Sequence, residues 1–278
     1  MADNVVANCV WNMDCENGMA LLPEGSVSLA FVDPPYNIGY DYGEGEYDDN
    51  MSPESYEAWC HSWMACLYYK LKPNGSFWLA IGDEWAAELA VLAKKQVGFH
   101  MRSWVVWYYT FGVNCSNKFT RSHCHLFHFT KHKTNFVFNK DDIRVPSARA
   151  AVYNDKRANP DGRLPDDTWI LRPQDCVDGF LPDDDVWSIP RVCGTHKQRV
   201  QGAANQMPEQ LIGRIVRACT NPGDLVLDPM CGTGTSLAVA KKLGRRYIGC
   251  DISSRFTELS AARVASVNVG DPLDGPIT

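Results

Sequence analysis

The stretch Val27-Ser28-Leu29-Ala30-Phe31-Val32-Asp33-Pro34-Pro35-Tyr36 decides how the rest of the chain is interpreted. Its first six residues are mostly apolar and predict a buried strand, which ends here because Pro34 cannot continue a sheet. Two successive prolines fix the backbone, so the Asp33 carboxylate and the Pro34 carbonyl keep one relation to the Tyr36 ring. The sequence therefore predicts a rigid loop at the carboxyl end of a strand.

This loop suits an amino group on a planar heterocycle. Asp33 and the Pro34 carbonyl can each accept one N–H of such an amine, which favours a pyramidal nitrogen with a free lone pair. A charge-assisted hydrogen bond of this kind contributes roughly 1.5–3 kcal/mol. Stacking of Tyr36 on the ring would add about 1–3 kcal/mol. The alternative is an ordinary proline-rich turn after a core strand.

A second stretch, Asp224 to Ser236, combines a strand, a glycine-rich turn and the start of a helix over 237–243. A further strand over 247–250 ends at Asp251, where a carboxylate can accept ribose hydroxyls. The Gly-x-Gly-x-x-Gly pattern of dinucleotide-binding sites is incomplete here, because Gly232 and Gly234 are not followed by its third glycine. Asp228 would repel a pyrophosphate but suits an ammonium group, so S-adenosylmethionine fits better than NAD.

Further elements follow from periodicity and from Gly and Pro positions. Strand, helix and strand over 8–32 form a βαβ unit, and the Gly-, Tyr- and Asp-rich segment 37–52 indicates a mobile lid. The remaining elements before residue 139 are helices from 52 to 71 and from 84 to 97, and strands over 76–81, 103–111 and 124–130.

Composition favours one cytoplasmic protein of 278 residues with a large core, since 45% of the residues are hydrophobic. No apolar run approaches the length of a membrane span, and the first residues do not resemble a signal peptide. Eleven cysteines without a Cys-x-x-Cys pair argue against disulfides and structural zinc. His123 and His125 share one strand face while Cys124 and His128 share the other, so we expect no metal site.

The net charge of −6 hides a basic middle. Residues 1–100 hold 4 Lys and Arg against 15 Asp and Glu, whereas residues 101–163 hold 11 against 4. A local basic face is enough for phosphate binding. Residues 139–204 show weak periodicity and dispersed arginines, which indicates either an inserted small domain with irregular elements or long loops. Arginine suits the reading of guanine edges, so this is the region in which we expect DNA contacts. The candidate DNA-contacting residues are Asn37, Lys118, Arg121, Arg144, Arg149 and Arg157.

Asp33-Pro34-Pro35-Tyr36, followed far downstream by Leu227 to Thr235, resembles the β group of DNA amino-methyltransferases, in which the catalytic motif precedes the cofactor motif. The resemblance covers nearly the whole chain. It implies an α/β fold, a circularly permuted Rossmann-like methyltransferase with a doubly wound, mostly parallel sheet and an inserted target-recognition region. The implied divisions are a catalytic half at 1–138, the insertion at 139–204, and a cofactor-binding half at 205–278.

The resemblance also implies roles for individual residues. Asp33, Pro34, Pro35 and Tyr36 would bind the target amine and stack on its base. Met230 and Cys231 depart from the usual Phe and small residue, and Met207 replaces a frequent Lys, which affects details of cofactor contact. The implied cofactor-binding residues are Asp14, Cys15, Asp33, Asp228, Met230, Cys231, Gly232, Thr233, Gly234, Thr235, Asp251 and Ser253.

The implied activity is site-specific methylation of adenine N6 in double-stranded DNA, with S-adenosylmethionine as cofactor and the base flipped out of the duplex. In this family the Asp-Pro-Pro-Tyr form usually accompanies adenine, and a Ser in the first position accompanies cytosine N4. Cytosine N4 methylation, an inactive binding protein of the same fold, and methylation of RNA or protein remain alternatives. A homodimer and a cognate restriction endonuclease are expected as possible partners.

Overall fold

The computed structural model describes residues 6–42, 47–113, 116–117, 119–145, 147–151, 153–167, 192, 199–200 and 206–273. Its centre is a seven-stranded sheet with the order β1-β7-β6-β2-β3-β5-β4. The five strands from β1 to β3 in that order are parallel, and β5 pairs antiparallel with both β3 and β4. The strands are β1 (Cys9–Asn12), β2 (Val27–Val32), β3 (Leu71–Ile81), β4 (His100–Val113), β5 (Arg121–Thr130), β6 (Leu225–Asp228) and β7 (Arg246–Asp251).

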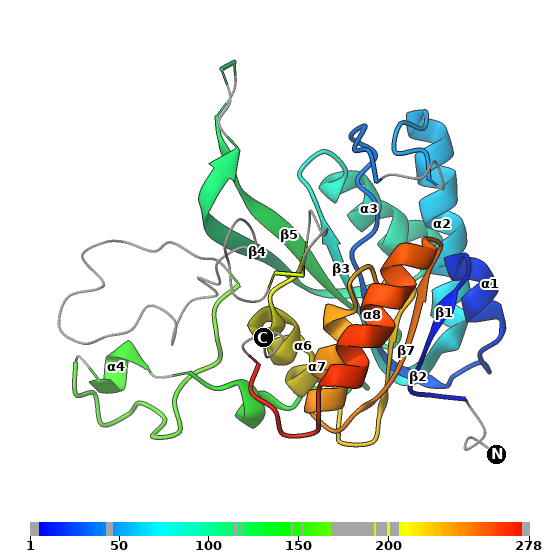
Figure 1. Cartoon of the computed structure of the whole chain (residues 1–278). Helices are drawn as coiled ribbons and strands as arrows, with labels where there is room; N and C mark the ends of the chain where they lie inside the picture. The colour runs from blue at the N-terminus through cyan, green and yellow to red at the C-terminus, as the bar shows by residue number, and fades with distance from the viewer. Residues whose placement is uncertain are drawn as a thin grey trace.

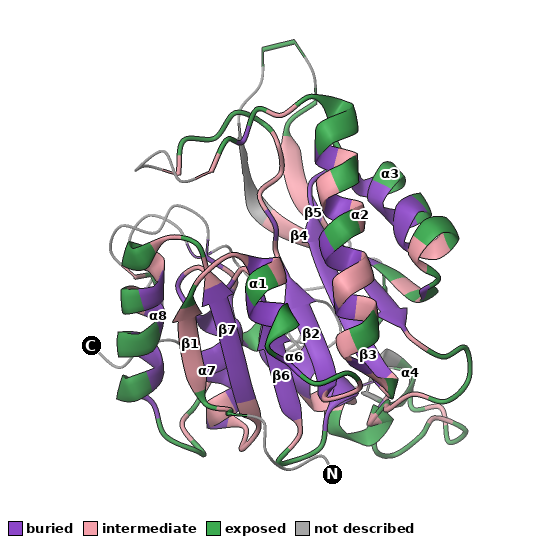
Figure 2. Cartoon of the chain, turned by 90° about the vertical axis from the view of Figure 1, so that its right-hand side faces the viewer, coloured by how far each residue is buried: buried purple, intermediate pink, exposed green. Residues whose placement is uncertain are grey.

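Helices cover both faces of the sheet (Figures 1 and 2). On one face α1, α2 and α3 pack on side chains such as Ala30 and Val32 of β2. On the other face α6, α7 and α8 pack on the alternating side chains, including Leu29 and Phe31. The helices are α1 (Cys15–Ala20), α2 (Pro53–Lys70), α3 (Ala86–Leu92), α4 (Ala148–Ala151), α6 (Glu209–Cys219), α7 (Thr235–Lys242) and α8 (Ser254–Ser266).

The connections reverse direction between β6 and β2, which are neighbours in the sheet. β6 continues through α7 to β7 on one side, whereas β2 continues through α2 to β3 on the other side. Ligands of doubly wound sheets bind at such a reversal, outside the carboxyl ends of the strands. The last strands of the chain thus lie between β1 and β2, and the predicted permuted, mostly parallel fold is confirmed.

The strands β3, β4 and β5 are longer than predicted, and β3 differs most at its start. β3 already pairs with β2 at Leu71, and the pairing resumes at Ser76 after a bulge. A Cβ on Gly75 in that bulge would lie 3.1 Å from the carbonyl oxygens of Val27 and Ser28, so only glycine allows the close approach. Residues 72–75, which the predictions place between the helix and the strand, are therefore an irregularity within β3.

The predicted helices differ from the structure mainly at their ends, and the sequence interpretation left out three described helices, α4, α6 and α8. The predicted helix over 84–97 is α3 followed by a π-helical turn at Ala93–Val97, which ends at Gly98 with a φ of 100°. α6 and α8 complete the second helical layer. No helix in the described part of the chain is long and apolar enough to cross a membrane.

The described portion of 139–204 contains a 3-10 turn at Lys140–Ile143, the short helix α4, and an antiparallel bridge between Val145 and Arg163. Figure 1 shows α4 to one side of the sheet and its helical layers. The domain boundaries stay a prediction.

Candidate active site

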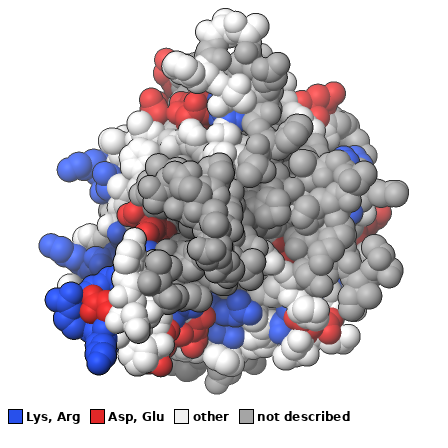
Figure 3. Space-filling model, turned by 90° about the vertical axis from the view of Figure 1, so that its left-hand side faces the viewer, with Lys and Arg blue, Asp and Glu red and all other residues white. Residues whose placement is uncertain are grey.

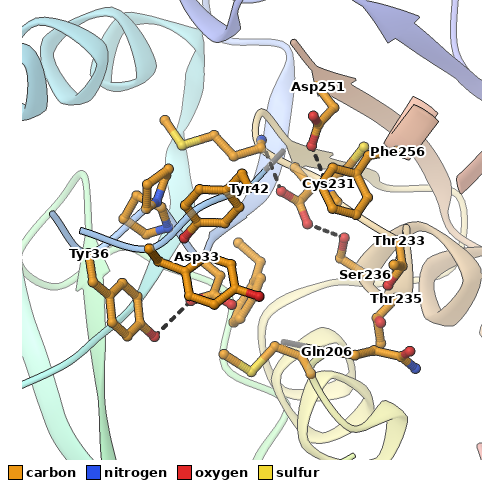
Figure 4. A pocket seen from close by; sticks show the side chains of 18 of the residues that line it. Asp33, Tyr36, Tyr42, Gln206, Cys231, Thr233, Thr235, Ser236, Asp251 and Phe256 are labelled. Carbon is orange, nitrogen blue, oxygen red and sulfur yellow. Dashed lines mark hydrogen bonds between the residues drawn. The ribbon is translucent and has the colours of Figure 1, made fainter. Parts of the chain in front are cut away.

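Four aspartates stand at the carboxyl ends of four adjacent strands. Asp14 follows β1, Asp251 ends β7, Asp228 ends β6 and Asp33 follows β2. All four line one cavity of about 670 Å³. Figure 4 shows Asp33 on one side of this cavity and Asp251 on the other. The fold thus gathers the predicted catalytic and cofactor motifs, although they are almost 200 residues apart in the chain.

The Asp33 side of the cavity is held by two hydrogen bonds. The Tyr36 hydroxyl donates a hydrogen bond to Asp33 Oδ1 over 2.8 Å. The Tyr56 hydroxyl donates to the Pro35 carbonyl over 2.6 Å, which ties the loop to α2. Burial raises the pKa of Asp33 to about 7, although the bond from Tyr36 acts in the opposite direction. Pro34 and Pro35 also line the cavity.

The Tyr36 ring is confined by β3 and β5. A Cβ on Gly82, just after β3, would lie 3.2 Å from Tyr36 Cδ2. Cys124 Sγ of β5 lies 3.5 Å from the Tyr36 hydroxyl. These contacts fix the ring beside the carboxyl group, and no large side chain could replace Gly82 without moving it.

The glycine-rich turn is fixed by hydrogen bonds to two aspartates. Asp228 is buried and accepts from the Ser236 hydroxyl and, over 3.2 Å, from the Met230 amide. Burial raises its pKa to about 7, and the nearby Asp33 charge acts in the same direction. Asp251 accepts from the amides of Gly232 over 2.8 Å and Ser253 over 3.0 Å.

Gly234 is required by geometry. Its φ is 72°, and a Cβ there would lie 2.2 Å from the Ser260 hydroxyl oxygen of α8. It does not line the cavity, unlike the neighbouring predicted residues Met230, Cys231, Gly232, Thr233 and Thr235.

At the β1 end, Asp14 and Cys15, which are predicted to bind the cofactor, line the cavity. Asp14 is the N-cap of α1, since its Oδ1 accepts from the amides of Glu16 over 2.9 Å and Asn17 over 3.3 Å. Burial raises the pKa of the Cys15 thiol, so it stays protonated. Ser253 caps α8 and also lines the cavity.

The described parts of segment 37–51 form a covering loop, residues 37–42 and 47–51, that is tied down at its base. Asp49 is buried and accepts from the amides of Asn37 over 2.8 Å and Tyr40 over 2.8 Å. Tyr42 and Tyr47 line the cavity. Figure 4 shows Tyr42 between Asp33 and Phe256 in this view.

Asn37, a predicted DNA contact, has a different use in this loop. Its side-chain oxygen accepts from the Met51 amide over 2.7 Å, and its side-chain nitrogen donates to the Met51 carbonyl over 3.0 Å. Its φ is 52°, the left-handed conformation that Asn tolerates. The Asn37 amide therefore closes the loop.

The wall beside Asp33 comes from β4 and β5. Trp107, Tyr109, Arg121 and His123 line the cavity there. Arg121 forms ion pairs with Asp83 and Glu84, which follow β3. Among the described residues, no group of three or more His, Cys, Asp or Glu side chains is arranged to hold a metal ion.

The other predicted DNA-contacting residues lie elsewhere. Arg144, Arg149 and Arg157 line a separate hollow of about 430 Å³. Arg149 and Arg157 both pair with Asp155, at 2.6 and 3.0 Å, and Arg144 pairs with Asp141. Figure 3, which shows the α4 side, has Lys and Arg gathered toward a lower edge beside Asp and Glu. Lys118 lies outside the described residues.

Sequence reasoning missed several cavity residues, because their positions depend on packing. The missed cavity residues include Tyr42, Trp59, Trp107, Tyr109, His123, Cys124, Gln206, Ser236, Arg255 and Phe256.

A buried cluster of charged side chains behind the glycine-rich turn was missed for the same reason. Glu209 accepts from Lys242 Nζ over 2.8 Å and from Arg263 Nη2 over 2.9 Å. Arg263 also donates to the Thr235 hydroxyl over 2.7 Å.

The lining of the cavity matches the chemical groups of S-adenosylmethionine. Its four aspartates suit the ammonium and sulfonium charges, and Asp251, which ends β7, can accept hydrogen bonds from ribose hydroxyls. Met230 and Phe256 supply apolar walls for an adenine ring. The donor set therefore fits this cofactor.

Comparisons with known proteins agree with this arrangement. The DNA methylase family model matches residues 27–262. The chain is 33% identical over 256 residues to type II methyltransferase M.HpaI of Haemophilus parainfluenzae, covering 91% of this chain and 73% of that protein. It is 31% identical over 248 residues to DNA adenine methyltransferase YhdJ of Escherichia coli K12, covering 87% and 78%.

Two solved structures share the fold. The M1.HpyAVI–SAM complex has a TM-score of 0.57 at 18% identity and covers 92% of this chain and 98% of its own. PvuII DNA methyltransferase, described as cytosine-N4-specific, has a TM-score of 0.59 at 17% identity and covers 91% and 84%. Since the family match spans most of the chain, the predicted relationship and cofactor are confirmed: the chain belongs to the DNA methylase family of amino-methyltransferases, which use S-adenosylmethionine.

Proposed function

We propose that the protein methylates the N6 amine of a flipped adenine at specific sites in double-stranded DNA. The observation that carries this proposal is the position of Asp33, which follows β2 in the cavity that also contains Asp228 and Asp251. An amine bound at Asp33 would thus lie at the edge of the sheet where the cofactor motif ends. Residues 139–204 are proposed as the target-recognition segment.

S-adenosylmethionine would supply an electrophilic methyl group on its sulfonium. Asp251 would accept hydrogen bonds from the ribose hydroxyls, and Asp228 would face the methionine ammonium. Gly232, which lines the cavity with a φ of 48°, allows the turn to approach the ligand closely. Gly234, with a φ of 72°, allows the close packing of this turn on Ser260. Asp14 and Cys15 would contact the edge of the adenine ring.

On the substrate side, Asp33 and the Pro34 carbonyl would each accept one N–H of the target amine. Bound S-adenosylmethionine would supply the methyl group that the amine nitrogen accepts by in-line displacement, with the neutral thioether as the leaving group. The nitrogen loses one proton, for which the Asp33 carboxylate is the base at hand. Positioning and exclusion of water supply most of the rate.

Extrusion of the base has its own cost. Unstacking and unpairing cost a few kcal/mol, which stacking and hydrogen bonds in the pocket must offset. Tyr36 supplies one aromatic face, and Trp107 and Tyr109 stand on the same side of the cavity. Aromatic contacts of this type contribute about 1–3 kcal/mol per base.

The target base is tested by expressing the chain in a host without DNA methylation and analysing its DNA nucleosides by mass spectrometry. We expect N6-methyladenine. N4-methylcytosine would instead support the second candidate function, cytosine N4 methylation. This candidate is kept because both amines offer two N–H groups to the same acceptors, and because one structural neighbour is described as cytosine-N4-specific. Absence of both products, with cofactor binding intact, would favour an inactive binding protein.

A further inference from the structure

The hairpin of β4 and β5 extends beyond the edge of the sheet that carries the active site. The last residue of β3, Ile81, pairs with His125, yet β5 begins four residues earlier, at Arg121. At about 3.3 Å per residue, β5 therefore starts roughly 13 Å beyond the carboxyl end of β3. Figure 1 shows this hairpin standing clear of the other elements.

A register shift separates the outer part of the hairpin from the sheet. Tyr108 pairs with His123, but the next pair is Val113 with Arg121, so β4 carries three more residues than β5 in this interval. Such irregularities bend and twist a strand pair. The outer hairpin can thus take its own direction while its inner part stays in the sheet.

The position of the hairpin is fixed next to the catalytic loop. Arg121, the first residue of β5, forms ion pairs with Asp83 and Glu84 after β3. Three residues further, Cys124 lies 3.5 Å from the Tyr36 hydroxyl. Whatever the outer hairpin presents is therefore held in a set relation to Asp33 and Tyr36.

What it presents is an aromatic ring. Phe119 lies two residues before Arg121 and is 100% exposed. Its described neighbours Ser116, Asn117 and Thr120 are also exposed, and they are polar. A single exposed apolar side chain is common on a protein surface. What assigns Phe119 to a ligand is its position, on a projecting hairpin that Arg121 and Cys124 hold against the catalytic loop.

We propose that Phe119 enters the base stack of the duplex and fills the space that the target base leaves. This inference rests on the proposed function. Apolar side chains inserted between base steps unstack DNA, and an enzyme that flips a base must stabilise the duplex it has opened. Phe119 supplies the ring, and the ion-paired Arg121 fixes where it enters.

The test uses a synthetic duplex carrying the site that wild-type enzyme modifies in genomic DNA, as mapped by sequencing of modified bases. A second duplex has an abasic position opposite the target base, so the base is already unpaired. Single-turnover methyl transfer is compared for wild type, Phe119→Ala and Phe119→Trp. The control is Tyr69→Ala, which removes an aromatic ring that is 59% exposed at the end of α2, next to the opposite edge of the sheet.

We expect Phe119→Ala to slow transfer at least tenfold on the paired duplex and less than twofold on the abasic duplex. Phe119→Trp should restore most of the rate, and Tyr69→Ala should match wild type on both. Equal rates of Phe119→Ala and wild type on the paired duplex would overturn the inference, as would equal losses on both duplexes. So would a change in oligomeric state alone, which would assign Phe119 to a protein interface. If wild type modifies no DNA at all, the proposed function itself fails.

Discussion

The Tyr36 hydroxyl donates a hydrogen bond to the Asp33 carboxylate over 2.8 Å, inside the cavity that also holds the glycine-rich turn. This bond favours the ionised form of Asp33, whereas burial favours the protonated form and raises the pKa to about 7. Ionised Asp33 is the form that accepts an amine N–H. The balance between these two effects therefore sets the pH above which Asp33 is ionised and can accept the amine N–H.

Replacing Tyr36 by Phe keeps the ring and removes the hydrogen bond. Because that bond lowers the pKa of Asp33, its loss should raise this pKa further. The acidic limb of kcat/KM against pH should then move to higher pH by about 1 unit, with roughly fivefold lower activity at pH 7 and recovery above pH 9. Steady-state kinetics between pH 5 and 10 measure this. A uniform loss at every pH would show that the hydroxyl acts in another way.

The variant Asp33→Asn should be more stable than wild type in alkaline solution. A carboxyl whose pKa is raised by folding stabilises the folded state at low pH, and this contribution is lost as pH rises through the folded pKa of about 7. The side chain is partly open to the cavity, so we expect a gain of about 1–3 kcal/mol at pH 8. Near pH 4 the two proteins should be similar. Urea unfolding at both pH values measures the difference, and equal stability at pH 8 would contradict this prediction.

Arg263→Met should destabilise the fold through the buried cluster behind the glycine-rich turn. The change removes one of two cations from Glu209 and the donor to the Thr235 hydroxyl. Removing one partner of a buried ion pair costs about 3–5 kcal/mol. Lys95→Met, at an exposed basic residue, is the control and should stay within about 0.5 kcal/mol of wild type. Comparable values for the two variants in urea unfolding would show that Glu209 needs only Lys242.

Asn37→Ala and Arg157→Ala should separate the two kinds of predicted DNA contact. The Arg157 side chain is 83% exposed, so its loss should weaken duplex binding at all sequences and reduce the slope of log K against log salt by about 1. Asn37 bonds to Met51, so its loss should lower the melting temperature and leave the salt slope unchanged. Fluorescence anisotropy with labelled duplex, at several salt concentrations, tests both. A reduced slope for Asn37→Ala would restore it as a DNA contact.

Much of the site was predictable because its key residues end strands. Asp33, Asp228 and Asp251 each follow an apolar run, and parallel strands bring their carboxyl ends to one edge of a sheet. The helix α6 was also predictable, although the sequence interpretation did not include it. Its buried face follows helical spacing, with Leu211, Ile212, Ile215 and Val216.

Other features could not be predicted, because they depend on contacts between distant segments. Glu209, Lys242 and Arg263 stand on three helices, and nothing in their spacing indicates that they meet. The role of Asn37 depends on its left-handed backbone and on Met51, fourteen residues later. The sequence around Gly75 predicts a turn. That β3 pairs with β2 on both sides of Gly75 depends on the position of β2, which the local sequence does not show.

The most direct test of the account compares Asp33→Ala with wild type in two measurements on the same preparations. One is methyl transfer from radiolabelled S-adenosylmethionine to unmethylated genomic DNA, and the other is calorimetric binding of the cofactor. We predict that transfer by Asp33→Ala falls to background while cofactor affinity stays within a few-fold of wild type. Retained turnover in the variant would contradict the assignment of Asp33 as the residue that binds the target amine.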